Sequence, residues 1–264
     1  MKLDREIVDR FLAGQEIADS WIFSQIEEGK HCFDLSDAVG KEGEIREITR
    51  RVSNFVNDFV PENEEVYRQL FPDYPTQLQQ VQVCLTVGCP NPYDAMVRQR
   101  EEGGVKQEVI VFDMVRFLAY GERALELISR LVTHETAHIL MHKRWPVLAQ
   151  EVTYRRQLQS FCFDEGFAHL LACGEKIASF DFGGWVAQHW EPSLQKLREA
   201  LACTDPQEQQ EWLCRAVAGP YWEKFACIAG KLYLAQHRDQ LSAIYSQGPD
   251  RFLPEIFSPA ERKA

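Results

Sequence analysis

The spacing of apolar residues predicts helices at the start of the chain. Apolar side chains recur every three or four positions over residues 3–28 and again over 43–60. This spacing is typical of helices with one buried face. Pro61 then marks the end of the second helix, because proline cannot continue the backbone ladder. The sequence therefore predicts a mostly helical N-terminal segment.

The pattern then changes to alternation. In QVQVCLTVG, residues 80–88, apolar side chains alternate with polar or small ones, which predicts a half-buried strand. VKQEVIVFDM, residues 105–114, predicts a second strand that is more apolar towards its end. Turn-forming residues lie between the two stretches, in CPNPYDAM and at 101–104. Together these stretches predict a small sheet.

Helical spacing returns at residues 122–143, with enough apolar side chains to predict a helix buried on most sides. Further helical patterns follow at 147–160, 164–173, 184–201, 207–217, 221–236 and 239–246.

The order of these elements predicts an α+β fold. A small mixed β-sheet lies next to the helix of residues 122–143, between the helical N-terminal segment and a helical C-terminal lobe. We expect one domain over residues 1–264, with sub-lobes 1–145 and 146–264.

Composition and charge exclude several classes of partner. Of the 264 residues 45% are hydrophobic, which is enough for a sizeable core, and the net charge is −11. An acidic surface disfavours nucleic acids and anionic membranes. The N-terminus is interrupted by charges, and no stretch has the roughly 18 apolar residues of a membrane span. We therefore expect a soluble cytoplasmic protein, whose oligomeric state the sequence leaves open.

The cysteines fit that compartment. None of the eight forms a CxxC pair, and most have apolar neighbours, as in SFCFD and FACIAG. The sequence predicts reduced core thiols, in preference to a set of disulfides or a structural zinc knuckle.

Candidate chemistry is concentrated in LVTHETAHILMH, in which residues 134–138 match H-E-x-x-H. On a helix, His134 and His138 are neighbours on one face and can bind one Zn²⁺ ion. Glu135 lies one step around the helix and can take a proton from a water bound to the metal. The alternative is a helix whose polar side chains face solvent or satisfied core contacts.

A catalytic zinc site needs a third protein ligand and one open position. His142 continues the same helix face, but it lies roughly 12 Å from His134 along the axis, which disfavours it as a ligand. We expect His142 to be a surface residue or a partner of the helix dipole.

FCFDEGFAHLLACG, residues 161–174, offers a third ligand. Here 26 residues separate His138 from Glu165, enough for a second helix to return and present that carboxylate. The alternative is that Asp164 and Glu165 only complement the dipole in the first turn of a helix.

HETAH followed by DEGFAHLLA resembles the gluzincin metallopeptidases, the thermolysin-like group. The resemblance covers roughly residues 100–174, and within that group the sequence is most similar to the poorly characterised zinc-dependent peptidases. The resemblance implies a thermolysin-like catalytic domain with His134, His138 and Glu165 as zinc ligands and Glu135 as general base.

Two features near Glu165 stay open. Thermolysin-like enzymes place an aspartate four residues after the ligand glutamate, where it holds a zinc histidine, and this chain has His169 there. His169 is either a side chain that supports the site or an ordinary helix-face histidine, and Asp164 is an alternative ligand.

The gluzincin peptidases also bind extended peptides along an edge strand, and VIVFDM, residues 109–114, is the expected counterpart.

Amide hydrolysis also needs a donor for the developing oxyanion. The resemblance implies a downstream Tyr or His, and GPYWEKFACIAGKLYLAQH offers Tyr221, Tyr233 and His237. We favour Tyr221, with a core tyrosine as the alternative.

The sequence thus predicts a zinc metallopeptidase that hydrolyses peptide bonds in peptide or protein substrates with a zinc-activated water. The alternatives are a zinc hydrolase acting on a non-peptide substrate and a non-catalytic zinc-binding interaction protein.

Overall fold

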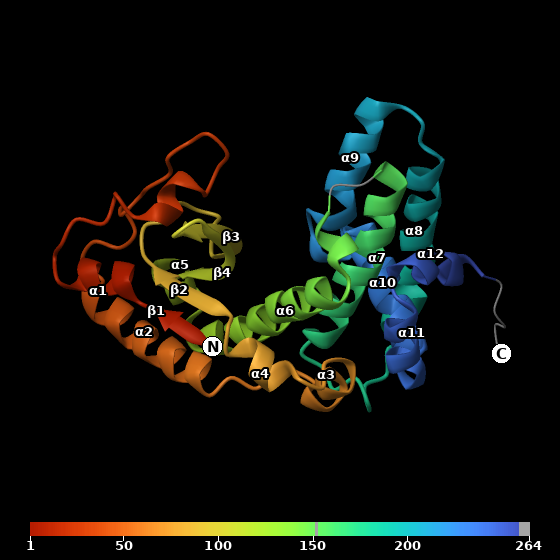
Figure 1. Cartoon of the computed structure of the whole chain (residues 1–264), viewed down its shortest axis with the longest axis horizontal. Coiled ribbons are helices and arrows are strands. Elements are labelled where there is room, and N and C mark those ends of the chain that lie inside the picture. The colour runs from red at the N-terminus through yellow and green to blue at the C-terminus, as the bar shows by residue number, and fades with distance from the viewer. Residues whose placement is uncertain (151–152, 259–264) are drawn as a thin grey trace. The chain divides into compact units, whose positions relative to one another are not determined.

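The computed structural model describes residues 1–150 and 153–258, which form two compact units (Figure 1). The first unit comprises Met1–Val60 and Asp73–Glu135, and the second comprises Pro61–Pro72 and the described residues from Thr136 onward. The α+β class with a small mixed sheet is confirmed. The single domain with sub-lobes 1–145 and 146–264 stays a prediction.

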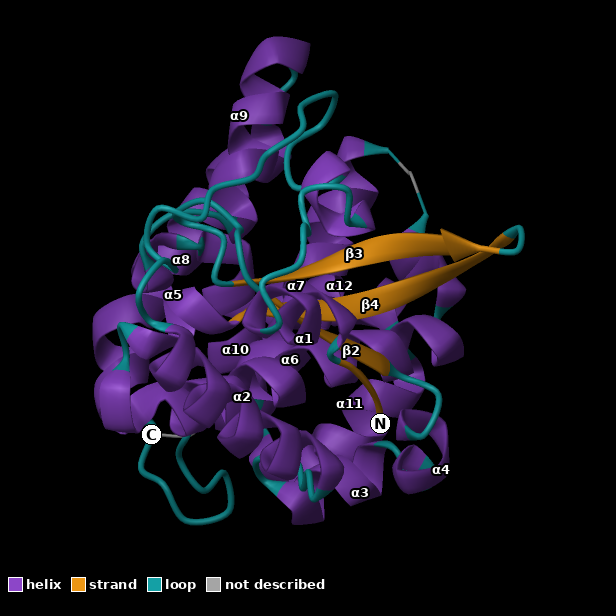
Figure 2. Ribbon diagram, turned by 90° about the vertical axis from the view of Figure 1, so that its left-hand side faces the viewer, coloured by secondary structure: helices purple, strands orange, loops and turns teal. Residues whose placement is uncertain are grey.

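The first unit is built on a four-stranded sheet in the order β1-β2-β4-β3. Strands β1 (Lys2–Asp4), β2 (Gln82–Thr86) and β4 (Val105–Asp113) are parallel, and β3 (Ala95–Glu102) pairs antiparallel with β4. Figure 2 shows β3 and β4 as the long hairpin of this sheet. Gly103 and Gly104, both with positive φ, form the turn between them.

The sheet corrects two expectations and contains two strands that were not expected. Strand β2 is buried from Val83 to Thr86 and not half-buried, because side chains on both faces of this parallel strand are enclosed. Residues 109–114 are not an edge strand, since β4 pairs on both sides and β3 forms the edge. Strands β1 and β3 were not predicted from the sequence, because β1 has only three residues and β3 is rich in charged side chains.

The first unit also contains the helices α1 (Glu6–Leu12), α2 (Glu42–Asn57), α4 (Tyr74–Leu78) and α5 (Met114–Leu118). Of these, α1, α2 and α5 pack against the sheet. The helix expected over 43–60 is confirmed in α2, but the one expected over 3–28 is wrong beyond Leu12. Gly14 there has a φ of 71°, a left-handed conformation that glycine adopts without steric cost and that ends the helix.

Asp113 joins β4 to α5. Its Oδ1 accepts hydrogen bonds from the backbone N–H groups of Val115 (2.9 Å) and Arg116 (3.2 Å), and its Oδ2 accepts one from Cys89 (2.7 Å). The side chain is fully buried, and this burial raises the pKa of Asp113 to about 6 in spite of the three bonds. Asp113 is therefore a buried N-cap.

Helix α6 (Ala124–Arg144) confirms the helix expected over 122–143 and carries the H-E-x-x-H stretch. It is continuous through the division of the two units, which falls between Glu135 and Thr136. In the second unit, the hydroxyl of the fully buried Tyr67 donates to Thr136 Oγ1 at 2.9 Å. This bond fixes the helix between the two motif histidines to the short helix α3 (Glu64–Leu70).

The rest of the second unit is helical. Its helices are α7 (Tyr154–Leu171), α8 (Gly183–Ala202), α9 (Pro206–Val217), α10 (Phe225–Gln236), α11 (Leu241–Gln247) and α12 (Pro249–Phe257). Figure 1 shows α10 running beside α7 and α8. A core of Phe163, Phe167, Tyr245 and Phe252 joins α7, α11 and α12 through ring contacts of 5.0–6.2 Å.

Helices α7 and α10 cross where each carries a glycine. A Cβ atom on Gly230 would lie 1.8 Å from the carbonyl oxygen of Cys162, and one on Gly166 would lie 2.9 Å from the Gly230 backbone. Only glycine permits this approach. The crossing sets the position of the neighbouring residues Glu165 and Lys231.

Several helix boundaries differ from the expected ones. The stretches expected as 147–160 and 164–173 form one helix, α7, after a short 3-10 turn at Pro146–Ala149, while residues 151–152 lie outside the described residues. Helix α12 was not expected. The remaining C-terminal helices lie close to their expected positions.

All eight cysteines are free thiols, and five of them are buried. Cys173 and Cys203 are half-buried and Cys214 is exposed, so these three are not core residues. Across the described ranges, every helix is too short or too polar to cross a lipid bilayer.

Candidate metal centre

Two helices supply the polar residues of the site. Helix α6 carries His134, His138 and His142 at intervals of one turn, and α7 carries Asp164, Glu165 and, one turn later, His169.

Asp164 contacts two histidines. Its Oδ2 is hydrogen-bonded to His142 Nε2 at 2.9 Å, and its Oδ1 lies 2.9 Å from His138 Nδ1. The second contact is equally short, but its alignment falls outside that of a hydrogen bond. The Asp164 side chain is only 13% exposed, so one shielded carboxylate restrains both imidazole rings.

These contacts decide the charge of Asp164. Burial opposes its ionisation, but the charge of His138 and the hydrogen bond from His142 outweigh burial and lower the pKa of Asp164. His142 is therefore a half-buried partner of Asp164 as well as a last-turn residue of α6, which refines the expectation of a surface residue.

Glu165 faces the other edge of the His138 ring. Its Oε1 lies 3.6 Å from His138 Nε2, and its Oε2 lies 3.5 Å from His169 Nε2. His138 thus meets Asp164 through Nδ1 and Glu165 through Nε2. Such a histidine is oriented by one carboxylate while its second nitrogen faces a possible ligand partner.

The spacing of these atoms suits a metal ion. Two ligands that each lie about 2.0–2.1 Å from a tetrahedral zinc ion are about 3.3 Å apart. The separation of 3.6 Å between His138 Nε2 and Glu165 Oε1 is close to that value. Imidazole nitrogen and carboxylate oxygen are also the donors that zinc takes in proteins.

In the described residues, two groups offer ligand atoms that all lie within 4.8 Å of one another. One is His134, Glu165 and His169, and the other is His138, His142 and Asp164. The expected set of His134, His138 and Glu165 is thus shared between the groups, with Glu165 beside His138 as well. The identity of a bound metal is not set by these groups.

The position of the acids within α7 removes one alternative. Asp164 and Glu165 lie in the second half of the helix and not in its first turn, so they do not complement the positive end of its dipole. The expectation of a helix beginning at 164 was wrong because the apolar pattern of α7 continues through Phe161 and Phe163 into Phe167.

Tyr221 lies beside this group. It begins a 3-10 turn, Tyr221–Glu223, and its ring packs edge-on against His169 with centroids 5.3 Å apart. Its hydroxyl accepts a hydrogen bond from Lys231 Nζ at 2.7 Å. The structure thus links Tyr221 to Glu165 through a single intervening residue, His169.

The two other oxyanion candidates have different partners. The hydroxyl of Tyr233 donates to Glu255 Oε2 at 3.3 Å, and the ring packs on Phe252. The Nδ1 atom of His237 lies 2.8 Å from the backbone oxygen of Tyr233, at the end of α10. Of these three residues, Tyr221 is the one whose ring packs against His169.

Sequence analysis missed Lys231, which is 1% exposed in the middle of α10. The signal was present: FACIAGKLYLAQ has one charge within an apolar helix. A lysine so placed is buried only where partners compensate its charge.

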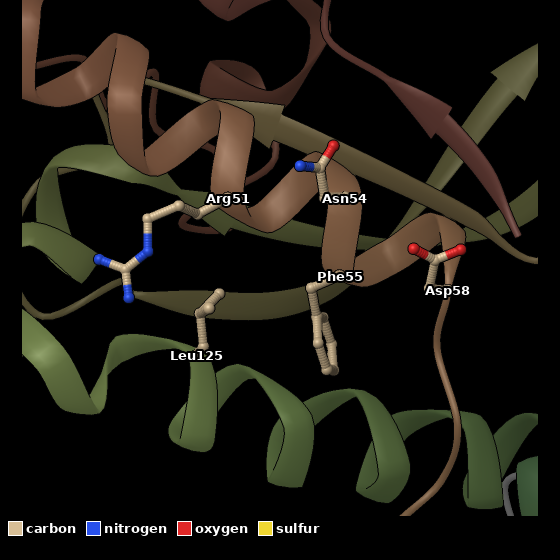
Figure 3. Close-up of a pocket in the computed structure, with 5 residues that line it drawn as sticks. All are labelled: Arg51, Asn54, Phe55, Asp58 and Leu125. Atoms are coloured by element: carbon tan, nitrogen blue, oxygen red, sulfur yellow. The ribbon is translucent and has the colours of Figure 1, made fainter.

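A surface hollow lies in the first unit, apart from these residues. It has a volume of about 360 Å³ and is lined by Arg51, Asn54, Phe55, Asp58 and Leu125. Figure 3 shows the first four along α2 and its C-terminal end, with Phe55 and Leu125 extending towards each other. None of the expected site residues lines it.

No protein-family model, curated protein or solved structure matches this chain. Any functional assignment therefore rests on the residues of the site and their geometry.

Proposed function

We propose that this protein is a zinc-dependent metallopeptidase of the gluzincin type. The observation that supports it best is the placing of His138 between two carboxylates. Asp164 restrains Nδ1, and Glu165 lies opposite Nε2 at nearly the spacing of two zinc ligands. A histidine held in this way is the usual form of a metal-binding imidazole.

His134, His138 and Glu165 would hold the ion, with Asp164 and His142 fixing the ring of His138. Bound zinc supplies a Lewis acid that polarises the scissile carbonyl and lowers the pKa of a water molecule.

The remaining chemistry belongs to side chains. Glu135, half-buried next to His134 on α6, takes a proton from the attacking water and passes it to the leaving amine. The hydroxyl of Tyr221, whose ring packs against His169, donates a hydrogen bond to the developing oxyanion.

One observation favours a second candidate, a non-catalytic zinc-binding protein. His169 Nε2 lies 3.5 Å from Glu165 Oε2, and His169 belongs to the same group as His134 and Glu165. If His169 takes the fourth position on the ion, the site is closed in the manner of a structural zinc site.

Metal content of the purified protein, compared among single variants, separates these functions. We expect one zinc per chain in the wild type, strongly weakened binding in His138→Ala and Glu165→Ala, and retained zinc in His169→Ala. Loss of zinc in His169→Ala together with no turnover identifies the closed site, and absence of zinc from the wild type overturns both functions.

Turnover is then measured with a peptide library and an ester panel, with Glu135→Gln as the control that keeps the ligands. Peptide cleavage that disappears in Glu135→Gln supports the peptidase. Ester hydrolysis without peptide cleavage contradicts the peptide substrate while leaving the metal centre in place.

A further inference from the structure

Lys231 is a buried cation next to the proposed oxyanion donor. It lies on α10 directly after Gly230, at the crossing with α7, and only 1% of it is exposed. Transferring a lysine ammonium group from water into a helical core is unfavourable without specific compensation.

Aromatic rings supply part of that compensation. The Nζ atom lies 4.2 Å from the ring centroid of Trp185, 5.1 Å from that of Tyr221 and 5.5 Å from that of Trp222. All three distances are within the range of a cation–π interaction. Lys231 is thus surrounded by ring faces from α8 and from the 3-10 turn before α10.

The ring of Tyr221, whose hydroxyl is hydrogen-bonded to Lys231, is held in place by its aromatic neighbours. Trp222 stacks on His189 with centroids 4.0 Å apart and an angle of 6° between the planes. Tyr221 packs edge-on against both Trp222 and His169, at 5.0 and 5.3 Å. Trp222 and His169 therefore limit the tilt of the Tyr221 ring.

The direction of the hydrogen bond between Lys231 and Tyr221 follows from chemistry. An ammonium group has three donors and no acceptor, so the Tyr221 oxygen accepts the bond of 2.7 Å. The phenolic hydrogen must then point to an acceptor other than Lys231. A hydroxyl that accepts from a cation is polarised and becomes a stronger donor.

From these contacts we infer that Lys231 is a positioning residue, which orients the Tyr221 hydroxyl as a hydrogen-bond donor to the substrate oxyanion. The inference rests on the proposed function. Tyr221 is 39% exposed, so substrate can reach it, whereas Lys231 is enclosed and its effect on substrate passes through Tyr221.

Kinetics of a double-mutant cycle tests this role. We expect Tyr221→Phe to lower kcat about 100-fold with little change in KM, the effect of removing one oxyanion donor. Lys231→Met, which keeps the length and apolar part of the side chain, should lower kcat roughly 10-fold, and should add nothing in the Tyr221→Phe background.

Two variants control for the substitutions themselves. Tyr233→Phe removes a tyrosine hydroxyl from α10, the helix of Lys231, and Lys224→Met removes a half-buried lysine at the start of that helix. Both should leave kcat and KM unchanged. Independent, multiplicative losses in Lys231→Met and Tyr221→Phe contradict the inference, because they show that Lys231 does not act through Tyr221.

A second measurement needs no activity. In protein labelled with 3-fluorotyrosine, the fluorine resonance of Tyr221 is identified by its absence from Tyr221→Phe. We expect Lys231→Met to shift this resonance and to leave that of Tyr233 in place. An unmoved Tyr221 resonance overturns the inference even where turnover is present. A shifted resonance in a zinc-loaded protein without turnover supports the contact but refutes both its catalytic use and the proposed function.

Discussion

Two aspartates, the fully buried Asp113 in the first unit and the largely shielded Asp164 in the second, have pKa values shifted in opposite directions. Asp113 in the first unit accepts three backbone hydrogen bonds, yet burial raises its pKa to about 6. Asp164 in the second unit is also shielded by burial, but His138 and His142 lower its pKa. Burial therefore outweighs three backbone hydrogen bonds and the charge of Arg116 at Asp113, whereas two adjacent histidines outweigh burial at Asp164.

The difference separates their roles. Asp113 needs only its shape and its acceptors to cap α5 and hold the backbone of Cys89. Asp164 needs its charge, because a carboxylate that orients an imidazole must remain an acceptor. Each of the following substitutions changes one side of this comparison.

The largest effect is expected from a substitution at the crossing of α10 with α7, the helix that carries Asp164. Gly230→Ala places a methyl group 1.8 Å from the Cys162 carbonyl oxygen, so α10 must move from α7. We expect a loss of about 3 kcal/mol or more in the free energy of unfolding, measured with urea. Gly184→Ala, where a Cβ meets nothing within 4 Å, is the matched control, and equal losses in the two variants contradict the crossing.

Removing the charge of Asp164 is next. Asp164→Asn removes the carboxylate charge that contacts both His138 and His142 and should cost about 3 kcal/mol at pH 6 in metal-free protein. The folded-state pKa of Asp164 is lowered, so its stabilisation exists above the unfolded value, near 3.8, and is lost as pH falls through the folded value. The deficit should therefore narrow in acid.

Urea unfolding between pH 2 and pH 7 measures this deficit, with Asp239→Asn, at an exposed position, as the control for loss of one negative charge. A deficit that stays constant down to pH 2 shows that the charge of Asp164 is not what stabilises the site.

Asp113→Asn should show the reverse dependence on pH. The folded pKa of Asp113, about 6, exceeds the ordinary value of 3.8, so its protonated form stabilises the fold at low pH and that stability is lost as pH rises through about 6. Asn supplies one acceptor fewer, which costs about 1–3 kcal/mol. The deficit of the variant should be greatest below pH 4 and shrink towards pH 7. Urea unfolding at four pH values measures it, and a deficit that grows with pH contradicts the raised pKa.

The smallest effect is expected from His142→Gln, which separates the contribution of His142 from that of His138. His142→Gln removes one of the two histidines that contact Asp164 but keeps a side chain able to donate, so we expect a loss of about 1 kcal/mol. His237→Gln, at the end of α10, is the control. A loss as large as that of Asp164→Asn shows that His142, and not His138, carries the pairing.

The elements that could be predicted from sequence are those whose own side chains specify them. Helix α6 has a long apolar period, and β2 and β4 are dense in Val, Leu and Ile, so local pattern sufficed. Strands β1 and β3 could not be predicted, because three residues and a charged edge become extended only through pairing with β2 and β4.

The candidate site divides in the same way. The helical spacing of His134 and His138 follows from four residues of separation. The role of Asp164 does not, since neighbouring acids on one helix point in different directions and only packing shows that one meets Nδ1 and the other Nε2 of His138. The sequence of α10 marks Lys231 as the one charge in an apolar helix, but it does not show that Trp185 and Tyr221 are its partners.

The burial of the cysteines has a practical consequence for handling the protein. Burial raises the pKa of Cys84 to about 12 and also raises that of Cys162, so these thiols stay protonated and react slowly with oxidants and alkylating reagents. Cys214 is the one exposed thiol of the described chain. A maleimide dye added briefly at neutral pH should therefore label Cys214 first, which gives a nearly single-site attachment point without any engineered cysteine.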